Sequence, residues 1–343
     1  MVDNLLADAL EEFLAGCCTP KRVREIEAEP SGDVARALWN EVQDSGFADA
    51  LIAETQGGAG LGLSDAALVA MACGRHAMPL PMALTLPVRA ALASVVEVPS
   101  GPTTIAQQMH AIPDTGPITC TAVPYGLAAD WVLLSSPSAD WLLPTVGAVR
   151  QPSGGQGSVA ADIRWERMPE NAVELPRTQG SANWRATAAA FVAAQMAGAM
   201  ERLLEMTISY ANDRSQFGKP ISKLQVIQHQ ISVMAEQTFA TRTAALIGLS
   251  GTDVQVDPLR AAIAKSRAGA AAVTVTASSH AVHGAIGVTE EFDLQLYTRR
   301  LHEWRGQYGG ETYWHQVLGN ALIDDTVPPL EFIMKLAAPV STS

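Results

Sequence analysis

A run of small residues near position 190 restricts the fold of this chain more than any other feature. From Ala186 to Met200 most positions are Ala or Gly, so a helix built from them would let neighbouring helices approach closely on several sides. Such a helix is typical of a bundle interior. Further helical patterns cover Gln225–Gly248, Pro258–His280 and a stretch after Thr289. We therefore predict a C-terminal four-helix bundle within residues 176–343.

The residues before the bundle divide into two regions. Residues 1–102 carry apolar positions at helical spacing and predict an N-terminal helical domain. Residues 103–175 contain short runs rich in Thr, Val, Leu and Trp, separated by Pro, Gly and Ser, which predict a small β domain. Within it, residues 151–158 indicate an exposed loop that tolerates change and forms no site. The predicted fold class is mainly α with a small β unit.

Composition limits the classes of partner. With 343 residues, 48% of them hydrophobic and 17% charged, the chain can bury a large core and still leave apolar surface for another subunit. A net charge of −12 without a dense Lys/Arg run argues against nucleic acid and anionic membranes as partners. The start of the chain is acidic and amphipathic, unlike a signal peptide, and no window holds 18 uninterrupted apolar residues.

The four cysteines have no metal-ligand spacing, and the adjacent pair Cys17-Cys18 is typical of buried apolar positions at the end of a helix. We expect no metal site and a reducing, cytoplasmic location.

A glycine-rich segment, residues 57–64, suggests a phosphate-binding loop as a minor alternative. Its glycines do not fit GxGxxG, no βαβ unit surrounds them, and the Lys-Ser/Thr ending of a P-loop is missing. We expect instead a turn before a helix from Asp65 to Arg75, with Ser64 as its N-cap.

The segment from Arg214 to Ile221 is a candidate anion clamp. Arg214 supplies a permanent charge with forked donors suited to a pyrophosphate, Gln216 adds a polar contact, and Phe217 adds an aromatic face. The alternative is a turn between two helices, in which Arg214 only neutralises helix-terminal carbonyls.

Residues 210–229 closely resemble the acyl-CoA dehydrogenase signature Arg-x-x-Phe-Gly followed by a Phe/Leu-Gln helix start. Weaker matches follow the family's order at residues 46–64, 74–81, 129–133 and 282–294, so the resemblance extends over the whole chain. It implies the acyl-CoA dehydrogenase fold, FAD as cofactor, an acyl-CoA substrate and electron-transfer flavoprotein as electron acceptor. It also implies contacts to an FAD bound mainly by a neighbouring subunit from Arg214, Gln216, Phe217, Gly218, Ile221, Leu224 and Ile227. In the same way, His283 and Gly284 are implied to form a turn beside the cofactor.

The family's reaction removes an α-proton with a carboxylate while hydride leaves Cβ. In most relatives this Glu precedes a Gly-Thr pair near the last helix, where this sequence has Gly309. In others it lies on the first bundle helix, where the region around Ala188 has no carboxylate. Glu311 is a weak candidate, because a shift of two residues rotates a helical side chain by about 200° or moves an extended one by about 6–7 Å. A flexible Gly309-Gly310 pair could still redirect it.

Part of the family's cofactor seat is also altered. A flavin-contacting Gln is replaced by Ala281, and the second Gly of the His-Gly-Gly run by Ala285. The segment with a Thr-Glu-Pro run before strands that contact the flavin ring is not found.

These losses suggest a subunit that lends FAD contacts to a catalytic partner in an α2β2 complex, similar to the small subunits of heteromeric acyl-CoA dehydrogenases of steroid side-chain degradation. Two alternatives stay open. One is a self-sufficient homo-oligomer with Glu311 as base, and the other is a non-enzymatic scaffold or acyl-CoA-binding protein on the same fold.

Overall fold

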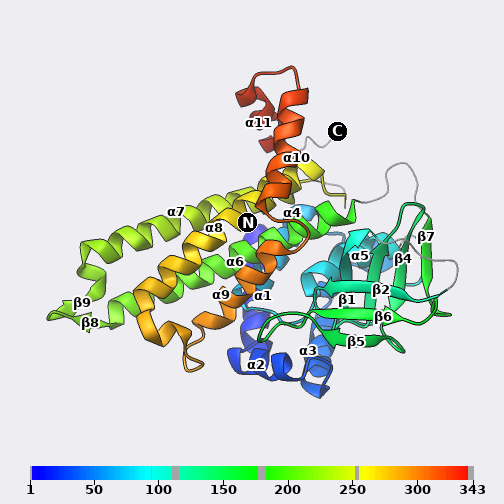
Figure 1. Cartoon of the computed structure of the whole chain (residues 1–343), viewed down its shortest axis with the longest axis horizontal. Coiled ribbons are helices and arrows are strands. Elements are labelled where there is room, and N and C mark those ends of the chain that lie inside the picture. The colour runs from blue at the N-terminus through cyan, green and yellow to red at the C-terminus, as the bar shows by residue number, and fades with distance from the viewer. Residues whose placement is uncertain (1, 94, 110–115, 177–182, 252–254, 339–343) are drawn as a thin grey trace.

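The computed structural model describes residues 2–93, 95–109, 116–176, 183–251 and 255–338. The chain begins with helices (Figure 1), which are α1 (Val2–Cys17), α2 (Pro20–Ala28), α3 (Asp33–Asp44), α4 (Leu63–Arg75) and α5 (Met82–Ala93), with short 3-10 turns η1 (Phe47–Asp49) and η2 (Glu54–Gln56). The helices α1, α2 and α3 direct an apolar face into a shared core, whereas α4 and α5 are buried on most sides. Cys17 and Cys18 are buried at the end of α1, and all four cysteines are free and buried.

Two small sheets follow and pack face to face. One has the order β1-β3-β4-β7 and the other β2-β6-β5. Their strands are β1 (Thr103–Met109), β2 (Ile118–Val123), β3 (Trp131–Ser135), β4 (Ala139–Pro144), β5 (Val149–Pro152), β6 (Ala161–Trp165) and β7 (Val173–Pro176). Apolar side chains such as Val132, Leu143 and Ile163 form a separate core in this β unit. The Trp165 indole donates to the Pro144 carbonyl at 2.7 Å, which satisfies its buried N–H.

The rest of the chain is helical. Its elements are α6 (Trp184–Asp213), the hairpin strands β8 (Ser215–Gln216) and β9 (Lys219–Pro220), η3 (Ile221–Lys223), α7 (Gln225–Gly248), α8 (Pro258–His283), η4 (Gly284–Val288), α9 (Leu294–Gly306), α10 (Glu311–Asp324) and α11 (Pro329–Ala337). The helices α6, α7, α8 and α9 pack as a bundle. The fold class, mainly α with a small β unit, is confirmed; domain boundaries after residues 102 and 175 stay a prediction.

Small residues let α6 pack closely against α4. A Cβ added at Gly198 would lie 1.9 Å from the Met71 carbonyl oxygen, and one added at Gly74 would lie 1.8 Å from that of Gln195. Both distances are far below van der Waals contact, so the two helices require glycine on both sides of their crossing. The small-residue run around position 190 therefore does form an interior helix.

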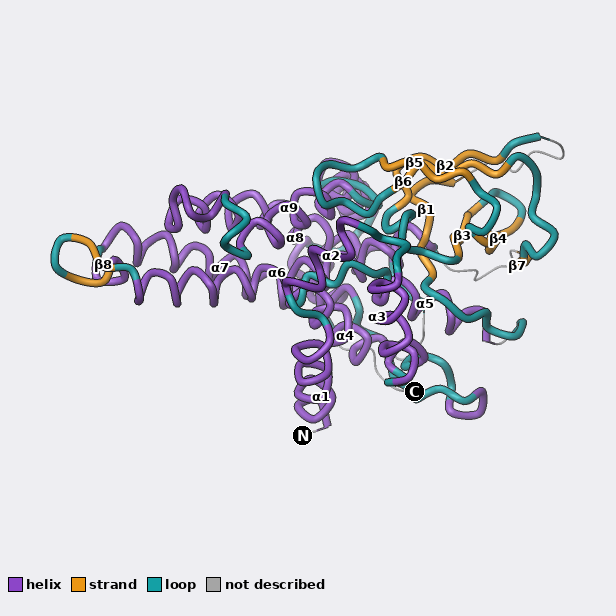
Figure 2. Tube along the Cα trace, turned by 90° about the horizontal axis from the view of Figure 1, so that it is seen from below, coloured by secondary structure: helices purple, strands orange, loops and turns teal. Residues whose placement is uncertain are grey.

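The bundle extends away from the rest of the molecule. The two views agree that α6, α7 and α8 run side by side, that the β8–β9 hairpin lies at one end, and that the β unit lies at the other (Figures 1 and 2). The helices α10 and α11 project from the body near the β-unit end of α8 (Figure 1). No helix in the described ranges is both long enough and apolar enough to cross a bilayer.

The glycine-rich segment before α4 is a turn, and its backbone amides are already bonded. The amide of Gly60 donates to the Ile52 carbonyl at 2.8 Å and that of Leu61 to the Ala50 carbonyl at 2.9 Å. The prediction that Ser64 caps this helix is wrong. The helix begins at Leu63 with Gly62 as N-cap, and the Asp65 carboxylate accepts from the Gly62 amide at 3.1 Å.

The loop after β5, predicted to be tolerant of change, attaches the β unit to α9. Ser158 Oγ donates to the Glu303 carboxylate at 2.7 Å, and Arg299 donates to the Gln156 carbonyl. Gly157 has a positive φ of 73°, and a Cβ there would overlap the Arg299 guanidinium. This contact could not be predicted, because it joins segments about 145 residues apart.

Candidate functional site

The predicted clamp is a hairpin at the far end of the bundle. Strands β8 and β9 pair Ser215 with Pro220 and Gln216 with Lys219, which leaves a two-residue loop of Phe217 and Gly218. Both loop residues have positive φ, 52° and 75°, the backbone pattern of a type I′ turn. Gly tolerates this conformation, but Phe217 holds it at a cost of about 1–3 kcal/mol while its ring is 88% exposed. A strained, exposed aromatic residue is typical of a binding element.

The hairpin is anchored from below. The Ile221 amide donates to the Arg214 carbonyl at 2.8 Å and closes the hairpin at its base. Ile221 is 8% exposed and packs with Ala211 and Val282, and the half-buried Leu224 and Ile227 lie against this cluster. In the isolated chain these apolar residues support the hairpin, whereas the turn itself faces solvent.

The side chains predicted to hold an anion are free. Arg214, Gln216 and Phe217 are all exposed, and within the described ranges neither polar side chain makes a hydrogen bond or ion pair. A guanidinium, an amide and an aromatic face thus lie together on one rigid turn. This set has the chemistry to bind an anionic, aromatic ligand.

His283 lies beneath the same end of the bundle. Its Nδ1 is 2.8 Å from the Ser279 carbonyl oxygen, its ring stacks on Tyr210 at 4.5 Å, and Phe292 lies 5.0 Å away. Burial lowers the pKa of His283, although the bond to Ser279 opposes this. The imidazole ring is thus packed between two aromatic side chains. Gly284, next along the chain, is exposed with φ of 63°. The structure places this turn near the hairpin anchor, because Val282 packs with Ile221.

The loop between α9 and α10 contains the expected base position, and it has no room for a side chain. Gly309 has a φ of 109°, and a Cβ there would lie 2.8 Å from Tyr313 Cδ1 and 2.9 Å from Trp314 Nε1. Its carbonyl accepts from Trp314 Nε1 and from Lys265 Nζ, both at 3.1 Å. Ala188, the other family position, is fully buried in α6. Neither position carries a carboxylate in this chain.

Glu311 is the first residue of α10, and it is held away from free solvent. Arg305 Nε donates to its carboxylate, and its side chain covers Gly269, where a Cβ would approach it within 2.8 Å. Partial burial raises the pKa of Glu311, but the hydrogen bond from Arg305 and the charge of Lys265 lower it below its usual value. A lowered pKa makes this carboxylate a weaker base. The structure shows an ion-paired residue rather than a solvated one.

Lys265 is a buried cation that sequence reasoning missed. It is 1% exposed, and its Nζ donates to the carbonyls of Arg305 at 2.8 Å and Gly309 at 3.1 Å. Burial lowers its pKa to about 7, with Glu311 opposing that shift. The sequence signal for this buried lysine was its position among small residues of a helix predicted to lie inside the bundle. Its two hydrogen bonds hold the loop at Gly309 against α8.

The hairpin and this loop are far apart in one chain. Lys265 contacts Gly309, and His283 lies by the hairpin anchor, so the 18 residues between them on α8 correspond to about 27 Å. A cofactor that reaches one chain's hairpin is therefore not centred on the same chain's loop.

Two family profiles match the chain. The acyl-CoA dehydrogenase N-terminal domain matches residues 3–99, and the acyl-CoA dehydrogenase C-terminal domain matches residues 186–305. The chain belongs to the acyl-CoA dehydrogenase family. The second match contains both the hairpin and its anchor. This assignment confirms the resemblance carried by residues 210–229.

Individual acyl-CoA dehydrogenases agree with this assignment. Acyl-CoA dehydrogenase IpdE2 of Mycobacterium tuberculosis is 29% identical over 87% of this chain and 90% of its own length. A variant of the steroid ACAD Tcur3481-Tcur3483 is 24% identical with a TM-score of 0.78, over 94% of this chain and 98% of that one. The ChsE4-ChsE5 complex from Mycobacterium tuberculosis is 20% identical with a TM-score of 0.77, over 95% and 98%. These structures confirm the acyl-CoA dehydrogenase fold.

In this acyl-CoA dehydrogenase family member the seam between the β unit and the bundle is closed at Tyr125 and Tyr308, and a cavity of about 420 Å³ lies beside this part, between residues 155–158 and α9. Tyr125 lies there, and its hydroxyl accepts from Gln195 at 3.2 Å; the Tyr308 hydroxyl donates to the Ile105 carbonyl at 2.8 Å. The cavity beside Tyr125 and Trp304 is only about 10 Å³, close to the smallest space that holds one water. A flavin ring does not fit a space of this size, whereas the side chains of the hairpin are exposed.

Proposed function

We propose that this chain is a subunit of an FAD-dependent acyl-CoA dehydrogenase that lends FAD contacts to a catalytic partner and lacks the usual Glu base. The observation that carries this proposal is the loop at Gly309. Its positive φ and the overlap of any Cβ with Trp314 leave no place for a catalytic side chain. A chain without a base can take part in the reaction only by completing another chain's site.

The hairpin carries the residues that would bind the partner's cofactor. Arg214 would bind the cofactor's pyrophosphate through charge-assisted hydrogen bonds, Gln216 would add a polar contact, and Phe217 would cover an aromatic group. When bound at the partner, FAD would supply the acceptor for the hydride from Cβ of the acyl-CoA, and the partner would supply the carboxylate for the α-proton. This chain's residues bind and orient; they move no proton.

The relatives suggest the substrate class and the assembly. One similar structure is described as a steroid ACAD and another as a complex of two differently named chains. We propose by analogy a bulky, steroid-derived acyl-CoA thioester, an α2β2 heterotetramer and electron-transfer flavoprotein as acceptor. A cytoplasmic location fits the four free, buried cysteines.

Co-expression tests the proposal. The chain is produced alone and together with a dehydrogenase-like protein whose gene we expect next to its own, and flavin per chain and acyl-CoA-dependent dye reduction are measured. We expect flavin and turnover only in the complex. Full flavin content and turnover by the lone chain would contradict the partner role.

Two variants of the complex test the cofactor-binding hairpin and the candidate base independently. Arg214→Ala should weaken FAD retention at least tenfold, because a charge-assisted hydrogen bond is worth about 1.5–3 kcal/mol. Lys223→Ala, which removes a nearby exposed cation, is the matched control and should retain FAD. Glu311→Gln should leave the rate nearly intact, since its carboxylate is bound to Arg305.

The same variants decide between the alternatives. A collapse of the rate in Glu311→Gln would favour a self-sufficient homo-oligomer with Glu311 as base. Unchanged flavin retention in Arg214→Ala, in any complex, would favour a non-enzymatic scaffold or acyl-CoA-binding protein.

A further inference from the structure

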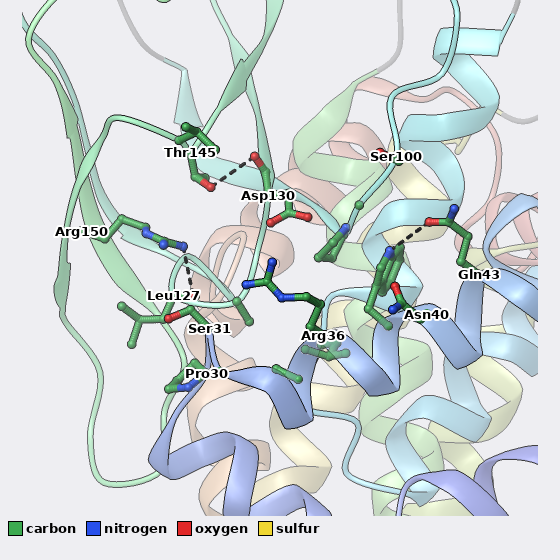
Figure 3. Close-up of a pocket in the computed structure, with 18 residues that line it drawn as sticks. Pro30, Ser31, Arg36, Asn40, Gln43, Ser100, Leu127, Asp130, Thr145 and Arg150 are labelled. Atoms are coloured by element: carbon green, nitrogen blue, oxygen red, sulfur yellow. Dashed lines mark hydrogen bonds between the residues drawn. The ribbon is translucent and has the colours of Figure 1, made fainter.

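A cavity of about 360 Å³ lies between α3 and the β unit, apart from the hairpin and from the loop at Gly309. Its wall is formed by α3, by the segment before β1, and by the residues that flank β3 and β4. Figure 3 shows Arg36 on α3 and Asp130 before β3 directed toward one another across this space, with Arg150 of β5 to one side. The volume is within the range of small-molecule sites, roughly 300–1,000 Å³.

No direct ion pair joins the charged side chains that line this cavity, and Arg36 and Asp130 are exposed in the described part of the chain. The Arg36 guanidinium makes no hydrogen bond or ion pair with any residue that the structure describes, and no direct ion pair joins it to Asp130. Arg150 uses one donor on the Leu127 carbonyl at 3.0 Å, which leaves its other donors available. Desolvation by the surrounding protein raises the pKa of Asp130, and the charges of Arg36 and Arg150 oppose this shift.

The arrangement of charge selects the ligand chemistry. A plain anion would be attracted by Arg36 and Arg150 but repelled by the Asp130 carboxylate, and a cation would be repelled by two guanidinium groups. A phosphate accepts bidentate hydrogen bonds from arginine, and a carboxylate accepts from hydroxyl groups. Asn40 adds an exposed amide on the α3 side of the cavity (Figure 3).

Apolar side chains also line this cavity. They are Trp39, Leu80, Pro102 and Leu127. The Trp39 indole N–H is already bonded to Gln43 Oε1 at 3.3 Å, so Trp39 offers carbon surface. Polar groups interspersed with apolar side chains are typical of small-molecule sites.

We propose that this cavity binds a small ligand that carries a phosphate group beside vicinal hydroxyl groups, the chemistry of a ribose phosphate. Arg36 and Arg150 would bind the phosphate, and Asp130 would accept hydrogen bonds from the hydroxyl groups. Because α3 and the β unit each provide part of the wall, the bound ligand would join the N-terminal helices to the β unit. The site is independent of the partner's FAD.

Titration of the purified full-length chain with adenosine monophosphate, by isothermal calorimetry, tests this assignment. We expect saturable binding, and at least tenfold weaker binding of both adenosine and inorganic phosphate, because each offers only half of the recognised chemistry. The absence of saturable binding, or equal affinities for phosphate and adenosine monophosphate, would overturn the proposal.

Two variants locate the site. Arg36→Gln should weaken adenosine monophosphate binding at least tenfold, as expected for loss of a charge-assisted contact. Asp130→Asn should weaken it while leaving inorganic phosphate unaffected or more tightly bound. Arg164→Gln removes an exposed cation that pairs with Glu166 on the same β unit, and it should bind like the unmodified chain.

Unchanged affinity in Arg36→Gln would place binding elsewhere and overturn the assignment. Far-UV circular dichroism shows whether each variant is folded; if Arg36→Gln does not fold, Asp130→Asn provides the same decision. The lone chain is used without flavin or acyl-CoA, so failure here leaves the proposed partner role untouched.

Discussion

At the scale of single residues, Gly309 has the largest consequence for function. Its backbone conformation is one that side-chain-bearing residues rarely adopt, and the aromatic rings of Tyr313 and Trp314 occupy the space beside it. Replacement by Ala should lower the free energy of unfolding by about 1–3 kcal/mol, through backbone strain and overlap. Urea denaturation measures this difference.

Gly310 is the matched control for that change. Its φ of −82° is ordinary, and nothing lies within 4 Å of the position that a Cβ would take there, so Gly310→Ala should change stability by less than about 1 kcal/mol. Equal losses in the two variants would show that the loop is not closed at Gly309 in particular. Gly309→Glu should not give the lone chain dehydrogenase turnover, because the same overlap excludes a side chain at this position.

Lys265 gives a pH-dependent contribution to stability. Its pKa in the folded chain is about 7 because of burial, whereas an unfolded lysine titrates near about 10.4. Between these values the unfolded chain binds a proton that the folded chain has lost, so the free energy of unfolding rises with pH, by at most about 1.4 kcal/mol per pH unit. The contribution is largest above pH 10 and is lost as the pH falls to 7.

Chemical denaturation from pH 6 to 10 of the chain and of Lys265→Met checks this dependence. The free energy of unfolding of the unchanged chain, minus that of Lys265→Met, should increase with pH. For Lys21→Met, at an exposed position of α2, the same difference should stay constant. A constant difference for Lys265→Met would contradict the lowered pKa.

At the scale of elements, the crossing of α4 and α6 depends on paired glycines. Gly198→Ala places a methyl group 1.9 Å from the Met71 carbonyl oxygen, so the helices must separate. We expect a loss of about 1–3 kcal/mol and a lower midpoint in thermal unfolding. Gly319→Ala, in α10 with open space around it, should instead be neutral or stabilising by about 0.5–1 kcal/mol. Opposite signs in the two variants are the expected result.

Elements of this chain could be predicted wherever a local signal exists. Pro258 begins α8 as expected because Asp257 caps it, its carboxylate accepting from the amides of Leu259 and Arg260. Strand β2 runs from Ile118 to Val123, as its β-rich composition predicts. The N-cap of α4 could not be placed, because Gly62 offers no side-chain signal.

The candidate site could be predicted only in part. The hairpin at Arg214 is local in sequence, so its type I′ turn and exposed side chains follow from neighbouring residues. The closed seam depends on Tyr125 meeting Gln195 and on Tyr308 meeting Ile105, pairs separated by 70 and 203 residues. The periodicity of one segment does not indicate which distant segment it will contact.

At the scale of the whole molecule, the open hairpin and the closed seam lie at different ends of the bundle. If each chain of this kind lends a hairpin but seats no flavin of its own, the complex should contain one FAD for each pair of chains. Absorbance of the flavin against the mass of the complex measures the ratio. One FAD for every chain would contradict the closed seam.

The exposed Phe217 has a consequence for the chain before assembly. A strained aromatic turn at the end of a long bundle would be covered only when the partner arrives, so a surplus of this chain would display it to proteases and chaperones. Synthesis of the two subunits in matched amounts would then be a requirement imposed by one hairpin, with unpaired copies removed by degradation.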